Sequence, residues 1–401
     1  MIKLKEQKTP SFSEFILLMA LFVALTAMSI DMVLPALSLI GQDLNAGSEN
    51  NTQYIIGILF LGLTLGQLIA GPIADSFGRK ATVYFGLVIF IIGTFLCLLA
   101  TSFFLMLMGR FLQGLGAAAP RNISLTMTRD MYKGRDMARV SSFIMAVFIL
   151  VPIIAPALGQ LVLFFGNWHL IFIVFLIMAL IIAILTYWRL PETLKAEDKR
   201  PFSVKSIWQG TCKVVGNKIT LGYTICAGLI FGALIGYLNS SRQIFQDYYH
   251  EGALFPLYFA IPAISIGMAS ILNSTIVRRY GMKLISHVAL LSMAIITTIF
   301  FTFFVWKVEQ TIFLAFMIYI TLVFFFMGLL FGNLNAMAME PMGHFAGIAS
   351  GIVGALSSAI SVIIGTIIGQ LYSGSLEPLI IGFLILSIAT FTLQHFIPKH
   401  S

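Results

Sequence analysis

Charged residues are scarce in this chain. They make up 10% of its 401 residues, whereas a soluble domain carries about 25% because its surface must meet water. Hydrophobic residues make up 59%, and the mean hydropathy is +0.98. A chain of this length with so few charges cannot cover a globule in polar groups. We therefore expect most of its surface to face lipid, which excludes a soluble globular fold.

Cysteine and histidine are also few. The three cysteines, Cys97, Cys212 and Cys226, stand singly in or beside apolar stretches, and the six histidines show no ligand spacing. Neither a disulfide framework nor a metal site can be built from them. The chain also has no phosphate-binding loop of the form Gly-x-x-x-x-Gly-Lys-Ser/Thr. We expect no metal, no cofactor, no ATP-driven step and no enzymatic activity.

Long apolar runs are abundant. Each is about 20 residues or more, enough to cross a hydrocarbon core of roughly 30 Å at about 1.5 Å per residue. The first run is too long for a signal peptide and lacks a cleavage site, so we expect it to be retained as a helix. The pattern predicts an all-α integral membrane protein of about 12 transmembrane helices. The runs lie near residues 15–41, 52–74, 81–101, 103–127, 139–164, 169–190, 220–245, 254–277, 284–305, 311–336, 345–371 and 377–396.

The net charge of +8 is distributed by topology. Lysines and arginines gather at the amino terminus (Lys3, Lys5, Lys8), in the links after the second, fourth, sixth and eighth runs, and at the carboxyl end. The opposite links carry only Arg242 and Lys307, although the link at 337–344, on the amino-terminal side, has no cation. Positive charge favours the cytoplasmic side. We therefore expect both termini in the cytoplasm and no nucleic-acid partner.

A long basic segment divides the chain into two halves. It predicts an amino-terminal six-helix bundle at 1–190, a cytoplasmic linker at 191–219 and a carboxyl-terminal six-helix bundle at 220–401. A faint repeat supports this division, because 75–80 is matched 203 residues later by 278–283, with an aromatic residue, a glycine and a terminal lysine in register. Two parallel repeats of six helices are expected.

Several motifs then resemble a known family. Residues 71–80 (GPIADSFGRK) resemble the G-x-L-A-D-R-x-G-R-K loop of the major facilitator superfamily, with Pro72 and Ser76 as departures. Residues 110–117 (RFLQGLGA) resemble the R-x-x-Q-G-x-G-A motif of drug:proton antiporters. Residues 31–37 (DMVLPAL) resemble the D-M-Y-L-P-A-L of the bicyclomycin- and chloramphenicol-resistance (Bcr/CflA) branch. The likeness extends to Arg129-Asp130, Ala155–Gly159, Trp168, Phe172, Phe331–Asn333 and Ala346–Ser350.

This resemblance implies a twelve-span transporter of two pseudo-symmetric six-helix bundles. It also implies export of small amphipathic compounds, such as antibiotics, in exchange for protons by alternating access. The implied partners are a small-molecule substrate, protons and membrane lipid, and a monomer in a bacterial inner membrane is expected. Two alternatives stay open: an exporter of a native metabolite or siderophore, and a non-transporting membrane sensor or lipid-handling protein. The paired depth of Asp31 and Arg110 disfavours the sensor.

Asp31 and Arg110 are the candidates for proton coupling. Asp31 is an isolated carboxylate in the first apolar run, and an ionisable group at membrane depth is a functional candidate because burial disfavours its charged form. Both residues are expected roughly 10–15 Å below the outer surface, where they can pair. The alternatives are a fixed ion pair for Asp31 and snorkelling to the interface for Arg110. Gln113 lies one turn from Arg110 on the same face.

The loop motif and two helix residues are candidates for gating. Asp75 is expected to pair with Arg129 or Arg135 in one conformation only, as a two-state latch. The alternative is a tight turn at Gly78 with topology charges. Pro156 can kink the fifth run, although Ala155 and Gln160 replace two glycines of the family's G-P-x-x-G-G pattern. The predicted gating residues are Gly71, Asp75, Gly78, Arg79, Lys80, Arg129, Asp130, Pro156 and Gly159.

Polar residues in apolar helices are candidates for the substrate cavity. They are Gln113, Tyr237, Asn239, Gln243 and Asn333, and Asn273 and Asn335 belong to the same class. Hydrogen bonding between helices is the alternative for each of them.

Overall fold

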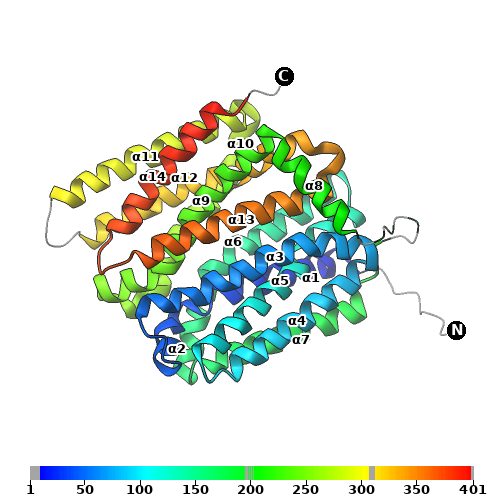
Figure 1. Ribbon diagram of the computed structural model, residues 1–401, viewed down its shortest axis with the longest axis horizontal. Helices are drawn as coiled ribbons and strands as arrows, with labels where there is room; N and C mark the ends of the chain where they lie inside the picture. Colours follow the sequence, from blue (N-terminus) through cyan, green and yellow to red (C-terminus); the bar gives the residue numbers. More distant parts are fainter. Residues whose placement is uncertain are drawn as a thin grey trace. The chain divides into compact units, whose positions relative to one another are not determined.

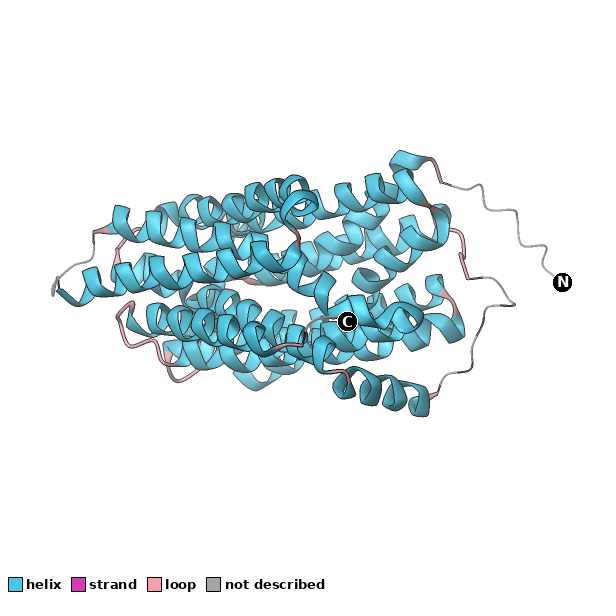
Figure 2. Cartoon of the chain, turned by 90° about the horizontal axis from the view of Figure 1, so that it is seen from above, coloured by secondary structure: helices cyan, strands magenta, loops and turns pink. Residues whose placement is uncertain are grey.

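The computed structural model describes residues 10–194, 197, 199, 201, 203–306 and 312–398. The terminal cations Lys3, Lys5, Lys8 and Lys399, together with Lys195, Arg200 and Lys307, lie outside these residues. Within the described residues the chain is helical throughout, with short connections (Figures 1 and 2). The long helices are α1 (Phe12–Asp31), α3 (Tyr54–Phe77), α4 (Arg79–Leu98), α5 (Phe103–Met131), α6 (Gly134–Phe165), α7 (His169–Arg189), α9 (Lys218–Gln243), α10 (Phe255–Tyr280), α11 (Met282–Trp306), α12 (Phe313–Met339), α13 (Ala346–Gln370) and α14 (Glu377–Phe396).

Among the described residues, eleven helical segments are long and apolar enough to cross a membrane, and a shorter apolar run, Leu150–Phe165, lies in α6. The predicted all-α membrane fold is confirmed. Short helices extend two of the crossings: α2 (Leu37–Asp43) continues α1, and the π-helix η4 (Ile244–Tyr248) continues α9. Large apolar side chains remain exposed along the helices, as lipid-facing surfaces require. On α11 they are Leu284, Val288, Leu291, Ile295 and Ile299.

The chain forms two compact units. The first comprises Met1–Gly47 and Ile58–Ile207, and the second comprises Ser48–Gly57 and Trp208–Ser401. The main division therefore falls inside 191–219, just within the amphipathic helix α8 (Val204–Gly216). The grouping of Ser48–Gly57 with the second unit was not predicted, because this segment stands between the first two apolar runs. Helix α3 begins in one unit and continues in the other.

Helix packing inside each unit follows the same plan. In the first unit α4 packs on α5 and α7, and α1 packs on α5, α6 and α7. In the second unit α11 packs on α12 and α14, and α9 packs on α12, α13 and α14. Each pair corresponds in chain order to a pair of the other unit. This correspondence is what two parallel repeats of six helices produce.

The sequence repeat marks equivalent turns in the two units. Gly78 joins α3 to α4 with φ +106°, and Gly281 joins α10 to α11 with φ +76°. Only glycine adopts this region without steric cost, so the two turns need the same residue. Lys80 and Lys283 each follow two positions later.

Glycines also bring α5 close to its neighbours. A methyl group at Gly62 or Gly66 of α3 would overlap backbone atoms of α5, and a methyl group at Gly114 would overlap the Leu59 carbonyl group. Small residues of this kind let membrane helices approach backbone to backbone. The close packing fixes the position of α5, the helix that bears the buried Arg110.

Candidate functional site

Asp31 is the last residue of α1 and is 4% exposed. The helix ends there because Pro35 lies four residues on, in the 3₁₀ turn η1 (Leu34–Ala36). A proline lacks a backbone donor and its ring crowds the carbonyl group four residues earlier. Helix α6 closes on this break, since a methyl group at Gly159 would overlap the Met32 carbonyl oxygen. The predicted gating glycine thus lies against the residue that follows Asp31.

Arg110 lies fully buried on α5. Its Nη2 donates a hydrogen bond of 2.7 Å to the Ser29 carbonyl oxygen of α1, and its Nη1 donates one of 2.8 Å to Oε1 of Gln113. Gln113 in turn donates to Oγ1 of Thr94 on α4, at 2.9 Å. This chain of bonds joins three helices. It holds the guanidinium group of Arg110 against the backbone of Ser29, which lies two residues before Asp31 in α1.

No ion pair between Asp31 and Arg110 is found in the described part of the chain. Their pairing stays a prediction. Gln113 was predicted to line the substrate cavity, and in this structure it orients Arg110 and is buried. Ser29 and Thr94 were missed, because a backbone acceptor has no sequence signal and a threonine in an apolar helix is common. The sequence signal that could have indicated this network is the spacing of Arg110 and Gln113, which lie one helical turn apart.

The predicted gating residues of the loop motif form a cluster around Arg79. Its Nη1 lies 2.5 Å from the Asp75 carboxylate, and its Nε lies 3.2 Å from the Asp130 carboxylate. Thr193 donates a second hydrogen bond to Asp130, at 2.8 Å. The Arg79 side chain is only 10% exposed, and the two carboxylates balance its charge.

Glu192 completes this cluster and was not predicted. Its carboxylate accepts hydrogen bonds from the backbone N–H groups of Arg79 and Lys80, at 2.9 and 3.0 Å. These are unpaired donors at the amino end of α4, where negative charge is favoured. The preceding residue, Gly78, has no side chain to cap them, and Glu192 occupies the space that a side chain there would fill. A contact across more than a hundred residues gave no local signal.

Other predicted gating residues are placed differently. Asp75 bonds to Arg79 in this structure, while Arg129 is exposed and the Arg135 side chain lies outside the described residues. The alternative pairing of Asp75 stays a prediction for another conformation. Gly71 has open space around it, so close packing does not account for it. Pro156 lies inside α6.

Most cavity candidates of the second unit bond between helices. Asn239 on α9 donates to the Gly365 carbonyl oxygen of α13, at 3.1 Å. Asn333 on α12 and Asn273 on α10 exchange hydrogen bonds of 2.9 and 3.1 Å. These contacts match the alternative that their sequence left open. Asn335, also on α12, donates to the Phe331 carbonyl oxygen of its own helix.

Tyr237 differs from these amides. Its ring stacks on Phe259 and meets Phe324 edge to face, and the side chain is 1% exposed. In the part of the chain that the structure describes, its hydroxyl group has no hydrogen-bond partner. An unpaired buried hydroxyl is costly, so Tyr237 remains a candidate for substrate contact.

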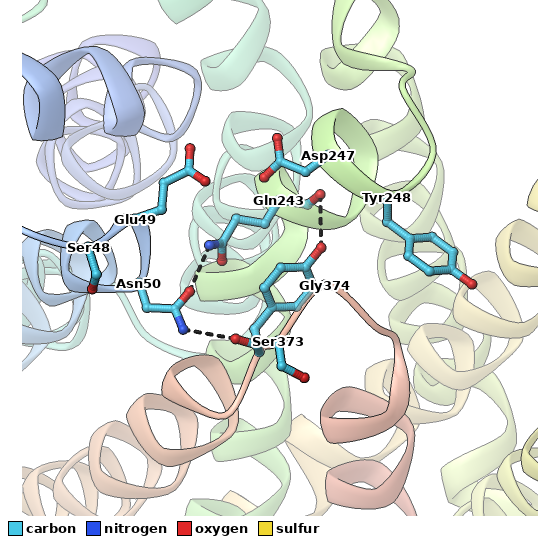
Figure 3. Close-up of a pocket in the computed structure, with 9 residues that line it drawn as sticks. Ser48, Glu49, Asn50, Gln243, Asp247, Tyr248, Ser373 and Gly374 are labelled. Atoms are coloured by element: carbon cyan, nitrogen blue, oxygen red, sulfur yellow. Dashed lines mark hydrogen bonds between the residues drawn. The ribbon is translucent and has the colours of Figure 1, made fainter.

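Gln243 belongs to a polar cluster in the second unit that sequence reasoning did not anticipate (Figure 3). Its Nε2 donates to Asn50 at 2.8 Å, and its Oε1 accepts from Gln53 at 2.8 Å. Asn50 donates to the Tyr372 carbonyl oxygen at 2.9 Å, and Gln370 donates to the Asn50 carbonyl oxygen at 2.7 Å. These bonds hold the short helix η2 (Glu49–Gln53) against α9 and α13.

A cavity of about 410 Å³ lies beside this cluster. Figure 3 shows Asn50 and Gln243 pointing toward one another at its wall, with Glu49 and Asp247 nearby. Burial, with the Asp247 and Glu49 carboxylates, raises the pKa of Tyr372 to about 12. Its hydroxyl group therefore stays protonated and donates to the Gln243 carbonyl oxygen at 3.3 Å.

An ion pair also ties this segment to α9. Nη1 of Arg242 lies 3.7 Å from the Glu49 carboxylate, and the arginine side chain is 11% exposed. The sequence interpretation had assigned Arg242 to a connecting link. The structure places it in the last turn of α9.

Comparison with known proteins agrees with this architecture. A sequence model described as the Major Facilitator Superfamily matches residues 19–366. An uncharacterized transporter of that type, YdgK of Bacillus subtilis, is 30% identical over 341 residues, covering 83% of each chain. A bicyclomycin resistance protein homolog of Haemophilus influenzae is 31% identical over 282 residues, 69% of each chain. The multidrug resistance protein MdtL of Citrobacter koseri is 30% identical over 238 residues, 59% of each.

Among solved structures, the human organic anion transporter MFSD10 (TETRAN) superposes with a TM-score of 0.71. The match covers 96% of this chain and all of that one, at 14% identity, which is a likeness of fold. The family match, the relatives and the corresponding helix packing of the two units lead to one conclusion: this multi-pass membrane protein is a transporter of the major facilitator superfamily.

Proposed function

We propose that the protein exports small amphipathic compounds, antibiotics among them, in exchange for protons. The observation that carries this proposal is the state of Asp31. Its side chain is buried at the broken end of α1, and no hydrogen bond or ion pair of its carboxyl group is found among the described residues. An unpaired carboxylate in an apolar environment is costly, and negative charge at a helix carboxyl end is also unfavourable. Binding a proton removes both costs.

Arg110 is the proposed counter-charge of Asp31 in the state that has released its proton. Its guanidinium group is anchored on the Ser29 carbonyl oxygen, so a small shift of α1 against α5 can bring Asp31 within pairing distance. When Asp31 releases its proton, pairing with Arg110 stabilises the carboxylate. The proton and the change of conformation are thereby coupled at one place.

Two polar clusters are the proposed gates of an alternating-access cycle. One is the Arg79 cluster with Asp75, Asp130 and Glu192. The other is the cluster of Asn50, Gln53 and Gln243, which binds segment 48–57 to helices of the second unit. The chain of this segment continues at Ile58 into the part of α3 that belongs to the first unit. Each cluster consists of directional bonds that can break and reform as a set, which suits a two-state element. Tyr237 is the proposed substrate contact in the second unit.

The direction of transport follows from the proposed topology. With both termini in the cytoplasm, Asp31 belongs to the outer half of its helix and takes its proton from the more acidic outside. The membrane potential contributes roughly 2.3 kcal/mol per charge per 100 mV. The names of the relatives, a bicyclomycin resistance homolog and a multidrug resistance protein, support antibiotics as the first substrates to test.

The test is accumulation of labelled compounds in energised cells that lack their own efflux pumps. The wild-type chain should lower accumulation, and an uncoupler should abolish the effect. Asp31→Asn should reach the membrane and bind substrate, yet fail to export. Glu14→Gln is the matched control, because Glu14 lies on the same helix but its carboxylate caps the exposed amino end. Uphill export by Asp31→Asn under a pH gradient contradicts the proposal.

A panel of labelled compounds that includes siderophores separates drug export from a native-metabolite role.

A further inference from the structure

The second unit contains a larger cavity that the proposed transport cycle does not use. It has a volume of about 650 Å³ and lies where α9 and α11 begin and α10 and α12 end. Because each of these helices is long enough to cross the bilayer, their ends lie at the depth of the lipid headgroups. The cavity therefore opens where a headgroup and the first carbons of an acyl chain meet the protein.

The lining of this cavity combines both charges with an apolar wall. Lys283 stands in the first turn of α11, and Glu340 follows the end of α12. His287 also lines it, one turn beyond Lys283, with Nδ1 3.2 Å from the Lys283 carbonyl oxygen. The wall is mostly apolar and aromatic, with Tyr223 and Leu284 among its members. A ligand with a phosphate, a cationic group and a hydrocarbon part complements this set.

An exposed apolar track leads away from the cavity. Leu284 lines it and is 54% exposed. The next exposed residues of α11 are Val288, Leu291 and Ile295, spaced at three or four positions. Residues at this spacing share one helix face, so a single stripe runs from the cavity along the membrane-facing side of α11. This stripe is part of the lipid-facing surface of α11, so the acyl chain of a lipid bound at the cavity can lie along it.

We infer that this cavity binds a membrane phospholipid whose headgroup carries a phosphate and a primary amine. Lys283 takes the phosphate, Glu340 accepts hydrogen bonds from the ammonium group, and an acyl chain follows the stripe of α11. A headgroup with a phosphate alone leaves Glu340 facing an anion. A quaternary ammonium group cannot donate to Glu340, and the alternative site for it, the ring of Tyr280, is already covered by the Arg279 guanidinium group at 5.3 Å.

The test is native mass spectrometry of the purified full chain in detergent. Phosphatidylethanolamine, phosphatidylglycerol and phosphatidylcholine with identical acyl chains are added in turn. The wild-type chain should retain the ethanolamine lipid best. Glu340→Gln should weaken its retention about tenfold, as expected for loss of one charge-assisted hydrogen bond, and should narrow the preference over the glycerol lipid. Lys283→Gln should weaken retention of all three lipids.

Matched controls keep the result specific. Arg278→Gln removes a cation from the same turn without altering the cavity lining, and Glu377→Gln removes a carboxylate at the first turn of α14. Both should retain the ethanolamine lipid as the wild type does. Lys283→Arg keeps the charge and should restore retention, which separates loss of the site from loss of folding.

Three outcomes overturn the inference. The first is equal retention of the three lipids by the wild-type chain. The second is retention that Glu340→Gln and Lys283→Gln leave unchanged. The third is full displacement of the lipid by glycerophosphoethanolamine, the headgroup without acyl chains, at the same concentration, because the site then belongs to a soluble phosphate compound. None of these measurements depends on transport.

Discussion

Arg110 on α5 donates a hydrogen bond to the backbone carbonyl oxygen of Ser29 on α1, at 2.7 Å. Ser29 lies in the last turn of α1, where carbonyl groups lack partners inside the helix. The positive charge thus meets the negative end of the helix dipole, which favours it. Pro35 creates this arrangement, because it ends α1 at Asp31 and leaves the acceptors that Arg110 uses.

Replacing Arg110 should cost stability as well as activity. Arg110→Ala removes the partners of the Ser29 carbonyl group and of Gln113, both buried, and we expect a loss of about 2–4 kcal/mol. Arg110→Lys keeps the charge but cannot reach two acceptors with a planar fork, so we expect partial stability and no coupled export. Thermal unfolding in detergent and proton-driven efflux measure the two effects. Wild-type unfolding temperature in Arg110→Ala would contradict this account of the anchor.

Two glycines of the predicted gating set, Gly159 and Gly71, should differ in how replacement by alanine changes the stability of the fold. A methyl group at Gly159 overlaps the Met32 carbonyl oxygen, whereas one at Gly71 meets nothing within 4 Å. Gly159→Ala should push α6 from α1 and cost about 1–3 kcal/mol. Gly71 lies inside α3, where alanine is the better helix former, so Gly71→Ala should keep or raise the unfolding temperature. Equal unfolding temperatures for the two variants would show that α6 does not pack on the end of α1 as described.

The polar cluster of the second unit should control the order of segment 48–57. Gln53→Leu leaves the Gly369 carbonyl oxygen and the Gln243 side chain without their donor. We expect faster hydrogen–deuterium exchange over 48–57, read by mass spectrometry of that peptide. Ser48→Ala is the control, since Ser48 lines the same cavity but makes none of these bonds. Unchanged exchange in Gln53→Leu would remove this cluster from the proposed gates.

The three native cysteines test the proposed topology without added labels. Cys212 is exposed on α8, in the segment expected in the cytoplasm, while Cys97 and Cys226 are buried. A membrane-impermeant maleimide should label Cys212 in inverted vesicles and leave intact cells unlabelled. Cys212→Ser should abolish labelling, which confirms the site. Labelling of Cys212 in intact cells would place the linker outside and reverse the proposed orientation.

The fold could be predicted from the sequence because lipid leaves the backbone few choices. A chain inside hydrocarbon must satisfy its own N–H and C=O groups, so long apolar runs become helices whatever surrounds them. The loop glycines followed the same local logic, since Gly78 and Gly281 occupy turns with positive φ. Asp31 and Arg110 stood out because an ionisable group is costly to place in an apolar run and is a functional candidate there.

The partners of those residues were decided by tertiary structure alone. Arg110 bonds to a backbone carbonyl group, which every residue carries, so no side chain at Ser29 announced it. Glu192 caps α4 from more than a hundred residues away, and Gln53 meets Gln243 across 190 positions. Composition determines which groups must avoid lipid, but a buried polar group finds its partner only where helix packing brings an acceptor within about 3 Å.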